Sequence, residues 1–70
     1  MDQQEYTIKA INLLPNKSKF AKSRNITRQA VQNWIKNGNV GGRHVLALEE
    51  AIGFKVKCYQ LRPDLFLKNT

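Results

Sequence analysis

Four helix-ending residues limit this chain more than any other feature. Pro15, Asn25, Gly38 and Gly53 interrupt the sequence at short intervals, and each favours a turn or a helix terminus. Only short helices fit between them, and apolar residues recur there at helical spacing. The pattern predicts an all-α fold, a bundle of four to five short helices in a single domain over residues 1–70, with little strand.

Capping residues predict the first helix. Asp2, with Glu5 three residues later, has the form of a capping box that begins a helix running to Leu14, and Pro15 ends it. The inward positions of this helix are Tyr6, Ala10, Leu13 and Leu14. Its apolar side should therefore face the rest of the bundle.

A helix-turn-helix pattern follows. Asn16 or Ser18 can cap the second helix, in which Ala21 is small enough to let another helix approach. Asn25 then occupies the turn position that requires a positive φ, and Thr27 caps a third helix. The segment therefore predicts two helices packed against each other through a tight turn.

The third helix, predicted to end near Lys36, separates its side chains by type. At 100° per residue, one arc contains only long hydrogen-bonding side chains and the opposite arc only apolar ones. The polar arc comprises Arg28, Gln29, Gln32, Asn33 and Lys36, and the apolar arc comprises Ala30, Val31, Trp34 and Ile35. An ordinary solvent face also contains Glu. This polar arc has no acid, which favours contact with a polyanion.

The charge distribution points to the same kind of partner. The chain carries 12 Lys and Arg against 5 Asp and Glu, a net charge of +7. Between Pro15 and His44 there are seven cations and no carboxylate. A surface charged only for solubility would mix the two signs. Double-stranded DNA is preferred over an anionic membrane surface, which would need a longer amphipathic helix.

A fourth helix is predicted after a glycine-rich connector, ending at Gly53. Its inward stripe comprises Val45, Leu48, Ala51 and Ile52. Leu46 lies off this stripe and belongs either to the core, which is preferred, or to a contact between subunits. The spacing thus predicts one buried side and leaves the role of Leu46 open.

In the tail, apolar residues alternate along the sequence and a short helix follows. Phe54, Val56 and Cys58 are compatible with a short extended stretch. A single turn of helix then ends at Leu61, because the proline at position 63 disfavours helical backbone at the residue before it.

Two segments resemble a known family. Residues 20–34 read FAKSRNITRQAVQNW and are similar to the LAKALGVSRQAVSQW signature of Cro-type phage repressors. Residues 60–66 read QLRPDLF and resemble the ELRPDLY ending of the YdaS-like branch, which includes proteins described as antitoxins. The resemblance covers most of the chain, from about Lys9 to Phe66. It implies a small lambda-repressor-like bundle that binds DNA as a transcriptional repressor, usually on two-fold operators.

The candidate DNA contacts form two groups. Arg recognises guanine, and Gln or Asn recognises adenine, through paired hydrogen bonds in the major groove. The base-reading candidates are Thr27, Arg28, Gln29, Gln32 and Asn33. The phosphate-binding candidates are Lys17, Ser18, Lys19, Arg24, Lys36 and Arg43. No cofactor is expected.

A homodimer is expected because one helix reads little sequence. The four main base-reading side chains specify only about four or five base pairs, too few to select one genomic site. We therefore expect a weak homodimer completed on a two-fold operator. The surplus apolar residues Leu46, Phe54 and Phe66, on the fourth helix and tail, are the candidate contact surface.

Other chemistries find little support in the sequence. His44 and Cys58 are the only residues of their types, too few for a metal site, and they favour neither metal binding nor enzymatic activity. We expect His44 at the surface or near phosphate and Cys58 as a small buried hydrophobe. One cysteine and no visible signal peptide or apolar span predict a cytoplasmic protein with no membrane segment.

A protein-interaction module is the alternative function. An antitoxin or antirepressor would neutralise a partner protein, such as a toxin, through a helix face or an apolar patch around Leu46 and Phe66. The polar arc of the third helix lacks the apolar anchors that such a face needs, which favours DNA binding. The two roles can coexist, because an antitoxin can also repress its own promoter.

Overall fold

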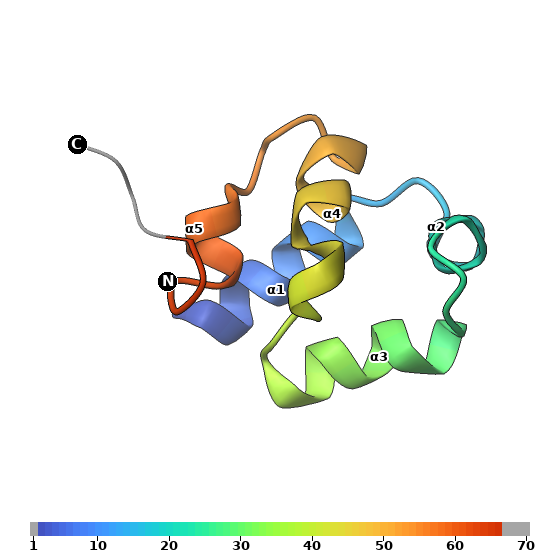
Figure 1. The fold of residues 1–70 in the computed structure, drawn as a ribbon, viewed down its shortest axis with the longest axis horizontal. Coiled ribbons are helices and arrows are strands. Elements are labelled where there is room, and N and C mark those ends of the chain that lie inside the picture. The colour runs from blue at the N-terminus through green and yellow to red at the C-terminus, as the bar shows by residue number, and fades with distance from the viewer. Residues whose placement is uncertain (1, 67–70) are drawn as a thin grey trace.

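The computed structural model describes residues 2–66, which form five α-helices and one short 3₁₀ helix (Figure 1). The α-helices are α1 (Gln3–Asn12), α2 (Lys17–Ser23), α3 (Arg28–Asn37), α4 (Val45–Ala51) and α5 (Cys58–Leu61), and the 3₁₀ helix is η1 (Gly42–His44). No strand occurs within the described residues. The predicted all-α bundle is therefore confirmed.

Local chemistry determines where α1 begins and ends. Asp2 accepts a hydrogen bond from a backbone N–H of the first turn (2.9 Å), as its cap requires. The helix was predicted to run to Leu14, but it ends at Asn12. Pro15 explains the difference, because the residue before a proline avoids helical backbone. Leu14 still packs into the core, whereas Leu13, predicted to face inward, is 36% exposed.

The centre of the bundle is α1, which packs against α3, α4 and α5. Figure 1 shows it behind α4 and above α3. The largest fully buried side chains on these four helices are Ile11, Val31, Leu48 and Leu61, all with no exposed surface. α2 adds Phe20 and Ala21 to the same core. Every helix therefore contributes to one core, and α3 is held against it along a single side.

The start of α1 and the end of α3 approach closely at Gly38. This glycine is buried, has a φ of 72°, and ends α3 in the left-handed conformation predicted for it. A Cβ there would lie 3.1 Å from the Cβ of Gln4. The Gln4 side chain donates to the carbonyl of Ile35 (3.3 Å), and buried Thr7 lies with its hydroxyl 3.4 Å from the carbonyl of Gly38. Only glycine fits here, because any other residue would strain the left-handed backbone and crowd the Cβ of Gln4.

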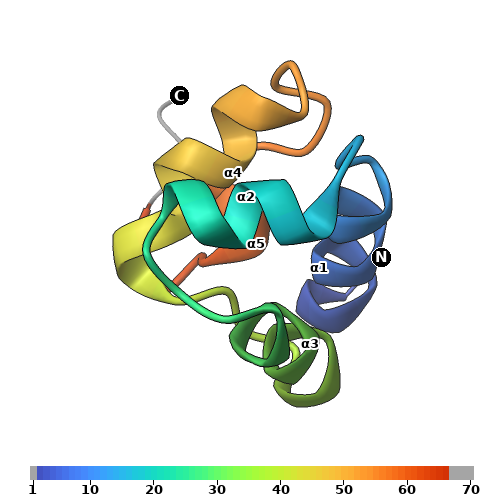
Figure 2. The same ribbon diagram turned by 90° about the vertical axis from the view of Figure 1, so that its right-hand side faces the viewer.

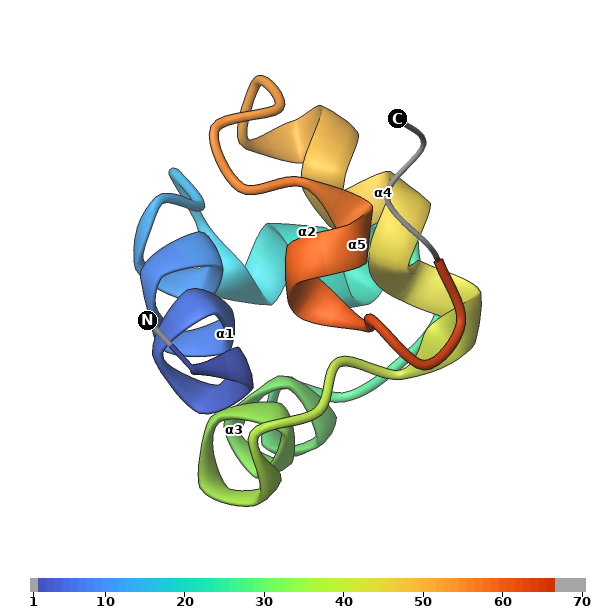
Figure 3. The same cartoon turned by 90° about the vertical axis from the view of Figure 1, so that its left-hand side faces the viewer.

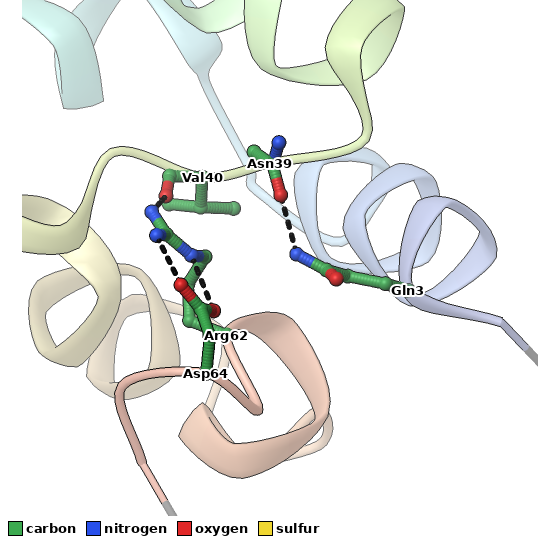
Figure 4. A network of polar contacts seen from close by, with 5 residues as sticks. All are labelled: Gln3, Asn39, Val40, Arg62 and Asp64. Atoms are coloured by element: carbon green, nitrogen blue, oxygen red, sulfur yellow. Dashed lines mark hydrogen bonds and ion pairs between the residues drawn. The ribbon is translucent and has the colours of Figure 1, made fainter.

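The loop after α3 is held from both ends of the described chain (Figure 4). Arg62 donates from Nη1 to the carbonyl of Val40 (2.8 Å) and forms a two-point ion pair with Asp64, at 2.7 and 3.0 Å. This ion pair lowers the pKa of the Asp64 carboxyl. Gln3 of α1 donates to the side chain of Asn39. Figure 3 shows this loop passing below α5 on its way to α4. The contacts from Arg62 and Gln3 hold the loop along this path.

The inward side of α4 differs from the prediction at two positions. Val45, Leu48 and Ile52 are buried as expected, but Ala51 is exposed. Leu46, for which core burial was preferred, is 56% exposed, so that assignment is wrong. The physical reason is that α4 packs mainly on α1, α5 and η1, and Leu46 does not lie on the side that meets them.

A compact turn replaces the extended stretch considered for residues 54–58. Gly53 and Phe54 have φ values of 69° and 62°, and their N–H groups donate to the carbonyls of Glu50 (3.1 Å) and Glu49 (2.9 Å). These two bonds form the paired terminus that often closes a helix. The chain therefore reverses at once, which leaves Phe54 49% exposed.

Glu49 connects this turn to α5. Its carboxylate is 8% exposed and accepts a hydrogen bond from the first N–H of α5, that of Cys58, at 2.7 Å. A buried carboxylate is stable only when it has such partners. α5 ends at Leu61, as predicted from the position of Pro63.

Candidate nucleic-acid interface

α2, α3 and residues 24–27 between them form a helix-turn-helix. Asn25 has a φ of 58°, the left-handed value predicted for the turn. The N–H of Ile26 donates to the carbonyl of Ala21 (2.9 Å), and Ala21 is 2% exposed where the two helices meet. In Figure 2, α2 lies across the view and α3 is seen below it, nearly end-on. The turn therefore sets α3 across α2 with one side facing away from the bundle.

Side-chain caps fix the starts of both helices. Thr27 accepts a hydrogen bond from the N–H of Ala30 (3.1 Å), and its O–H is still able to donate to another group. Asn16 accepts from the N–H of Lys19 (2.9 Å). Of the two residues considered for the cap of α2, Asn16 is therefore the one that forms it, and Ser18 is left exposed.

The predicted polar arc of α3 faces solvent. Its exposed residues are Arg28, Gln29, Gln32, Asn33 and Lys36. On the opposite side Val31 is completely buried and Trp34 is 8% exposed. Trp34 packs edge-on against Phe20 of α2, with ring centroids 6.5 Å apart. Trp34 is thus a core residue, as predicted, and cannot stack on a base in this fold.

Two amides on this arc contact each other. Gln29 donates from Nε2 to Oδ1 of Asn33 at 3.3 Å, across one helical turn. The bond uses one of the two Nε2 hydrogens of Gln29, and both side chains keep further donors and acceptors. The pair therefore presents a joint set of hydrogen-bonding groups at the solvent side of α3.

The phosphate-binding candidates fall in three places. Lys17, Ser18 and Lys19 form the first turn of α2, where Lys17 is half-buried and the other two are exposed. Lys36 is exposed in the last turn of α3. Arg43 is exposed on η1, a separate element. The structure thus groups the first three and places Lys36 beside the base-reading candidates.

Arg24 differs from the other candidates because its guanidinium is bound within the protein. It is half-buried, and it donates to Nδ1 of His44 (3.1 Å) and to the carbonyl of Arg43 (3.2 Å). The His44 ring in turn lies against Trp34, with centroids 5.6 Å apart and planes tilted by 32°. Arg24 therefore ties the turn of the helix-turn-helix to η1.

The environment of His44 keeps its ring neutral. Burial lowers its pKa, and the charges of Arg24 and Arg43 lower it further. Arginine is always protonated, so Nδ1 can accept from Arg24 only while it carries no proton. Sequence reasoning placed His44 at the surface or near phosphate and missed this contact, since the two partners are 20 residues apart.

No cluster of metal-ligating side chains accompanies this surface in the part of the chain that is described. Within residues 2–66, no three His, Cys, Asp or Glu side chains gather as metal ligands. Cys58 is half-buried, and burial together with the carboxylate of Glu49 raises the pKa of its thiol. None of the described helices is long and apolar enough to cross a bilayer.

The fold and its exposed surface define a class of protein. The chain is a small all-helical protein in which a helix-turn-helix presents an acid-free polar arc. It belongs to the family described as bacterial toxin YdaS, whose sequence model matches residues 7–70. The match includes most of α1 and all of α2 to α5, and confirms the YdaS-like resemblance. No curated protein and no solved structure matches the chain.

Proposed function

We propose that this protein is a sequence-specific transcriptional repressor of the Cro type that binds double-stranded DNA. The observation that carries the proposal is the exposed arc of α3, which contains guanidinium, amide and ammonium groups and no carboxylate. Such groups read base edges, and a carboxylate there would be repelled by phosphate. The proposal places the protein in the cytoplasm, without cofactor or enzymatic activity.

The dimensions of α3 support its insertion in the major groove. The helix has 10 residues, a length of about 15 Å, and the groove is about 12 Å wide and admits an α-helix. Val31 and Trp34 hold it on the core from one side. The whole polar arc can therefore enter a groove without exposing the core.

Each candidate then has a role in this proposal. Arg28, Gln29, Gln32 and Asn33 read base edges, and Thr27 contacts a base or the backbone. Lys17, Ser18, Lys19, Lys36 and Arg43 bind phosphate. Arg24 uses two of its five guanidinium hydrogens on His44 and on the carbonyl of Arg43, so it holds the turn in position while its Nη1 group remains able to bind phosphate.

Binding of duplex DNA across a range of salt concentrations tests the proposal. Each neutralised phosphate contributes about −0.9 to the slope of log K against log salt, so five contacts give about −4 or steeper. Selection from random duplexes should also enrich one sequence. A slope near zero, with no enriched sequence, would overturn the proposal.

The alternative is a module that neutralises a partner protein, as an antitoxin or antirepressor does. The observation that favours it is the exposure of Leu46 and Leu65, at 56% and 53%. The word toxin in the family's description is compatible with a repressor, because blocking an essential promoter harms a cell, and it does not favour an antitoxin. Gln32→Ala separates the two: a repressor loses its effect on cells, whereas a partner-binding module keeps it.

A further inference from the structure

A groove separates α2 from α4. The helix α4 packs mainly on α1, α5 and η1, and the side that it turns toward α2 carries the small residues Ala47 and Ala51. Ser23 of α2, another short side chain, lines the groove from the opposite side. Figure 2 shows α4 above α2. Because the side chains on both walls are short, the protein does not fill the space between the two helices.

Two hollows of about 320 and 460 Å³ join to form this groove. Phe20, Ser23 and Ala51 line both hollows, so the two are continuous. The first hollow is also lined by the core residue Leu14 and by Pro15, which make its surface mostly apolar. Small-molecule sites usually measure about 300–1,000 Å³ and combine an apolar lining with a few polar groups. The groove therefore has the size and the lining of a small-ligand site.

The second hollow is lined by one positive and one negative side chain that do not pair. These are Arg24 and Glu50, and within residues 2–66 they form no ion pair with each other. Arg24 donates from Nε to His44 and from Nη2 to the carbonyl of Arg43, which leaves both hydrogens of Nη1 unused. Glu50 is exposed and has no charged partner among the described residues. A group that binds carboxylates and a group that binds ammonium ions thus share one small space.

We propose that this groove binds a free α-amino acid with an apolar side chain. The carboxylate of the ligand binds Nη1 of Arg24, its ammonium binds Glu50, and its side chain lies along Phe20 in the apolar hollow. Charge selects this ligand class, because Glu50 repels a simple anion and Arg24 repels a simple cation, whereas a zwitterion complements both. Lys19, exposed at the edge of the apolar hollow, can cover the ligand side chain with its methylene stem. For so small a ligand the dissociation constant is on the order of 1 mM.

Arg24 links this groove to the helix-turn-helix. Its Nη1 hydrogens are those that remain able to bind phosphate, and a ligand carboxylate bound to them excludes phosphate. The amino acid should therefore weaken DNA binding and make the slope of log K against log salt shallower by about 0.9, the contribution of one phosphate. This last step rests on the proposed function. The binding of the amino acid itself does not, and it is tested without DNA.

Titration of the DNA-free protein with L-phenylalanine at constant pH, followed by amide NMR shifts, tests the site. The shifts should be largest at Ser23, Ala47 and Ala51, and should give one dissociation constant. N-acetyl-L-phenylalanine lacks the ammonium and L-phenylalanine methyl ester lacks the carboxylate, so each should bind more weakly by roughly fivefold or more. L-alanine, which lacks the large side chain, should bind more weakly still. The ester also represents the amino end of a peptide chain, so binding of the ester as tight as that of the free amino acid would overturn the proposal.

Variants of the protein complete the design. Glu50→Gln should weaken L-phenylalanine by the same factor as N-acetylation does, and should leave the N-acetyl compound unaffected. Glu5→Gln, at an exposed carboxylate on α1, is the matched control and should change neither. Ala51→Leu should fill the groove and abolish binding of every compound, and the fold should persist because Ala51 is exposed.

Three results would overturn the site. They are no shift at the groove with about 20 mM L-phenylalanine, which is well above the expected dissociation constant, equal binding of L-alanine, and equal effects of Glu50→Gln and Glu5→Gln. Loss of DNA binding in a protein that still binds the amino acid would refute the proposed function alone. DNA binding with no amino-acid binding would refute this site alone.

Discussion

Replacing Gly38 by alanine is expected to destabilise the protein more than the same change at Gly53. Both glycines have left-handed backbone, with φ of 72° and 69°, so a Cβ brings similar strain to each, about 1–2 kcal/mol. Their surroundings differ. A Cβ at Gly38 would lie 3.1 Å from the Cβ and 3.4 Å from the Cα of Gln4, whereas a Cβ at Gly53 would meet nothing within 4 Å.

The difference between the two variants measures the close approach of α1 and α3. Gly38→Ala forces α1 to shift by a few tenths of an ångström, because the atoms it meets belong to or adjoin the backbone of that helix. Such overpacking adds about 1–3 kcal/mol to the strain, giving a total of about 2–5 kcal/mol against about 1–2 kcal/mol for Gly53→Ala. In a domain of this size, each kcal/mol lowers Tm by about 4–8 °C.

Urea unfolding followed by circular dichroism gives both free energies. The slope of the free energy against denaturant should stay that of the wild type, so that the comparison reports stability alone. Gly53→Asn should recover part of the loss, because asparagine tolerates this backbone, whereas Gly38→Asn should not. Equal losses for the two alanine variants would refute the argument that α1 packs directly on Gly38.

Three further predictions concern the helix-turn-helix. Trp34→Ala should lower stability by about 3–5 kcal/mol, and the wild-type fluorescence should be blue-shifted; red-shifted emission that DNA quenches would contradict its burial. Because the pKa of His44 is lowered in the folded protein, the unfolded chain takes up a proton at a higher pH than the folded one. The contribution of neutral His44 to stability should therefore be lost as pH falls below about 6.5. His44→Gln should remove this part of the pH dependence of Tm. Identical profiles of Tm against pH for the wild type and the variant would rule out this role of His44. Gln29→Ala should lose about 1–3 kcal/mol on the preferred DNA sequence and relax one position, while Lys17→Ala should weaken all sequences alike; uniform weakening by both would mean that Gln29 reads no base.

Local rules explain why much of the helix-turn-helix was predictable. The cap at Thr27, the positive φ of Asn25 and the left-handed end at Gly38 each depend on one residue type and its nearest neighbours. The polar arc of α3 follows from helical spacing alone, so the exposure of Gln32 and Asn33 was also predictable.

Tertiary placement explains what the sequence could not predict. The exposure of Leu46 depends on which side of α4 is left uncovered, and helical spacing contains no such information. The bond from Arg24 to His44 joins segments whose relative position is set by the whole core. The burial of Glu49 could not be predicted either, because nothing in its neighbours shows that it will bind the first N–H of α5. Each of these contacts appears only once the helices are assembled.

The contact between Arg62 and Val40 also bears on the order in which this fold is acquired. The two residues are 22 positions apart, and a growing chain emerges from its amino end. α2 and α3 are therefore synthesised well before the guanidinium that anchors the loop after them. An excised segment containing α2 and α3 alone would lack this anchor and the support of α1, so transplanting the recognition surface onto another protein requires the whole chain rather than its middle third.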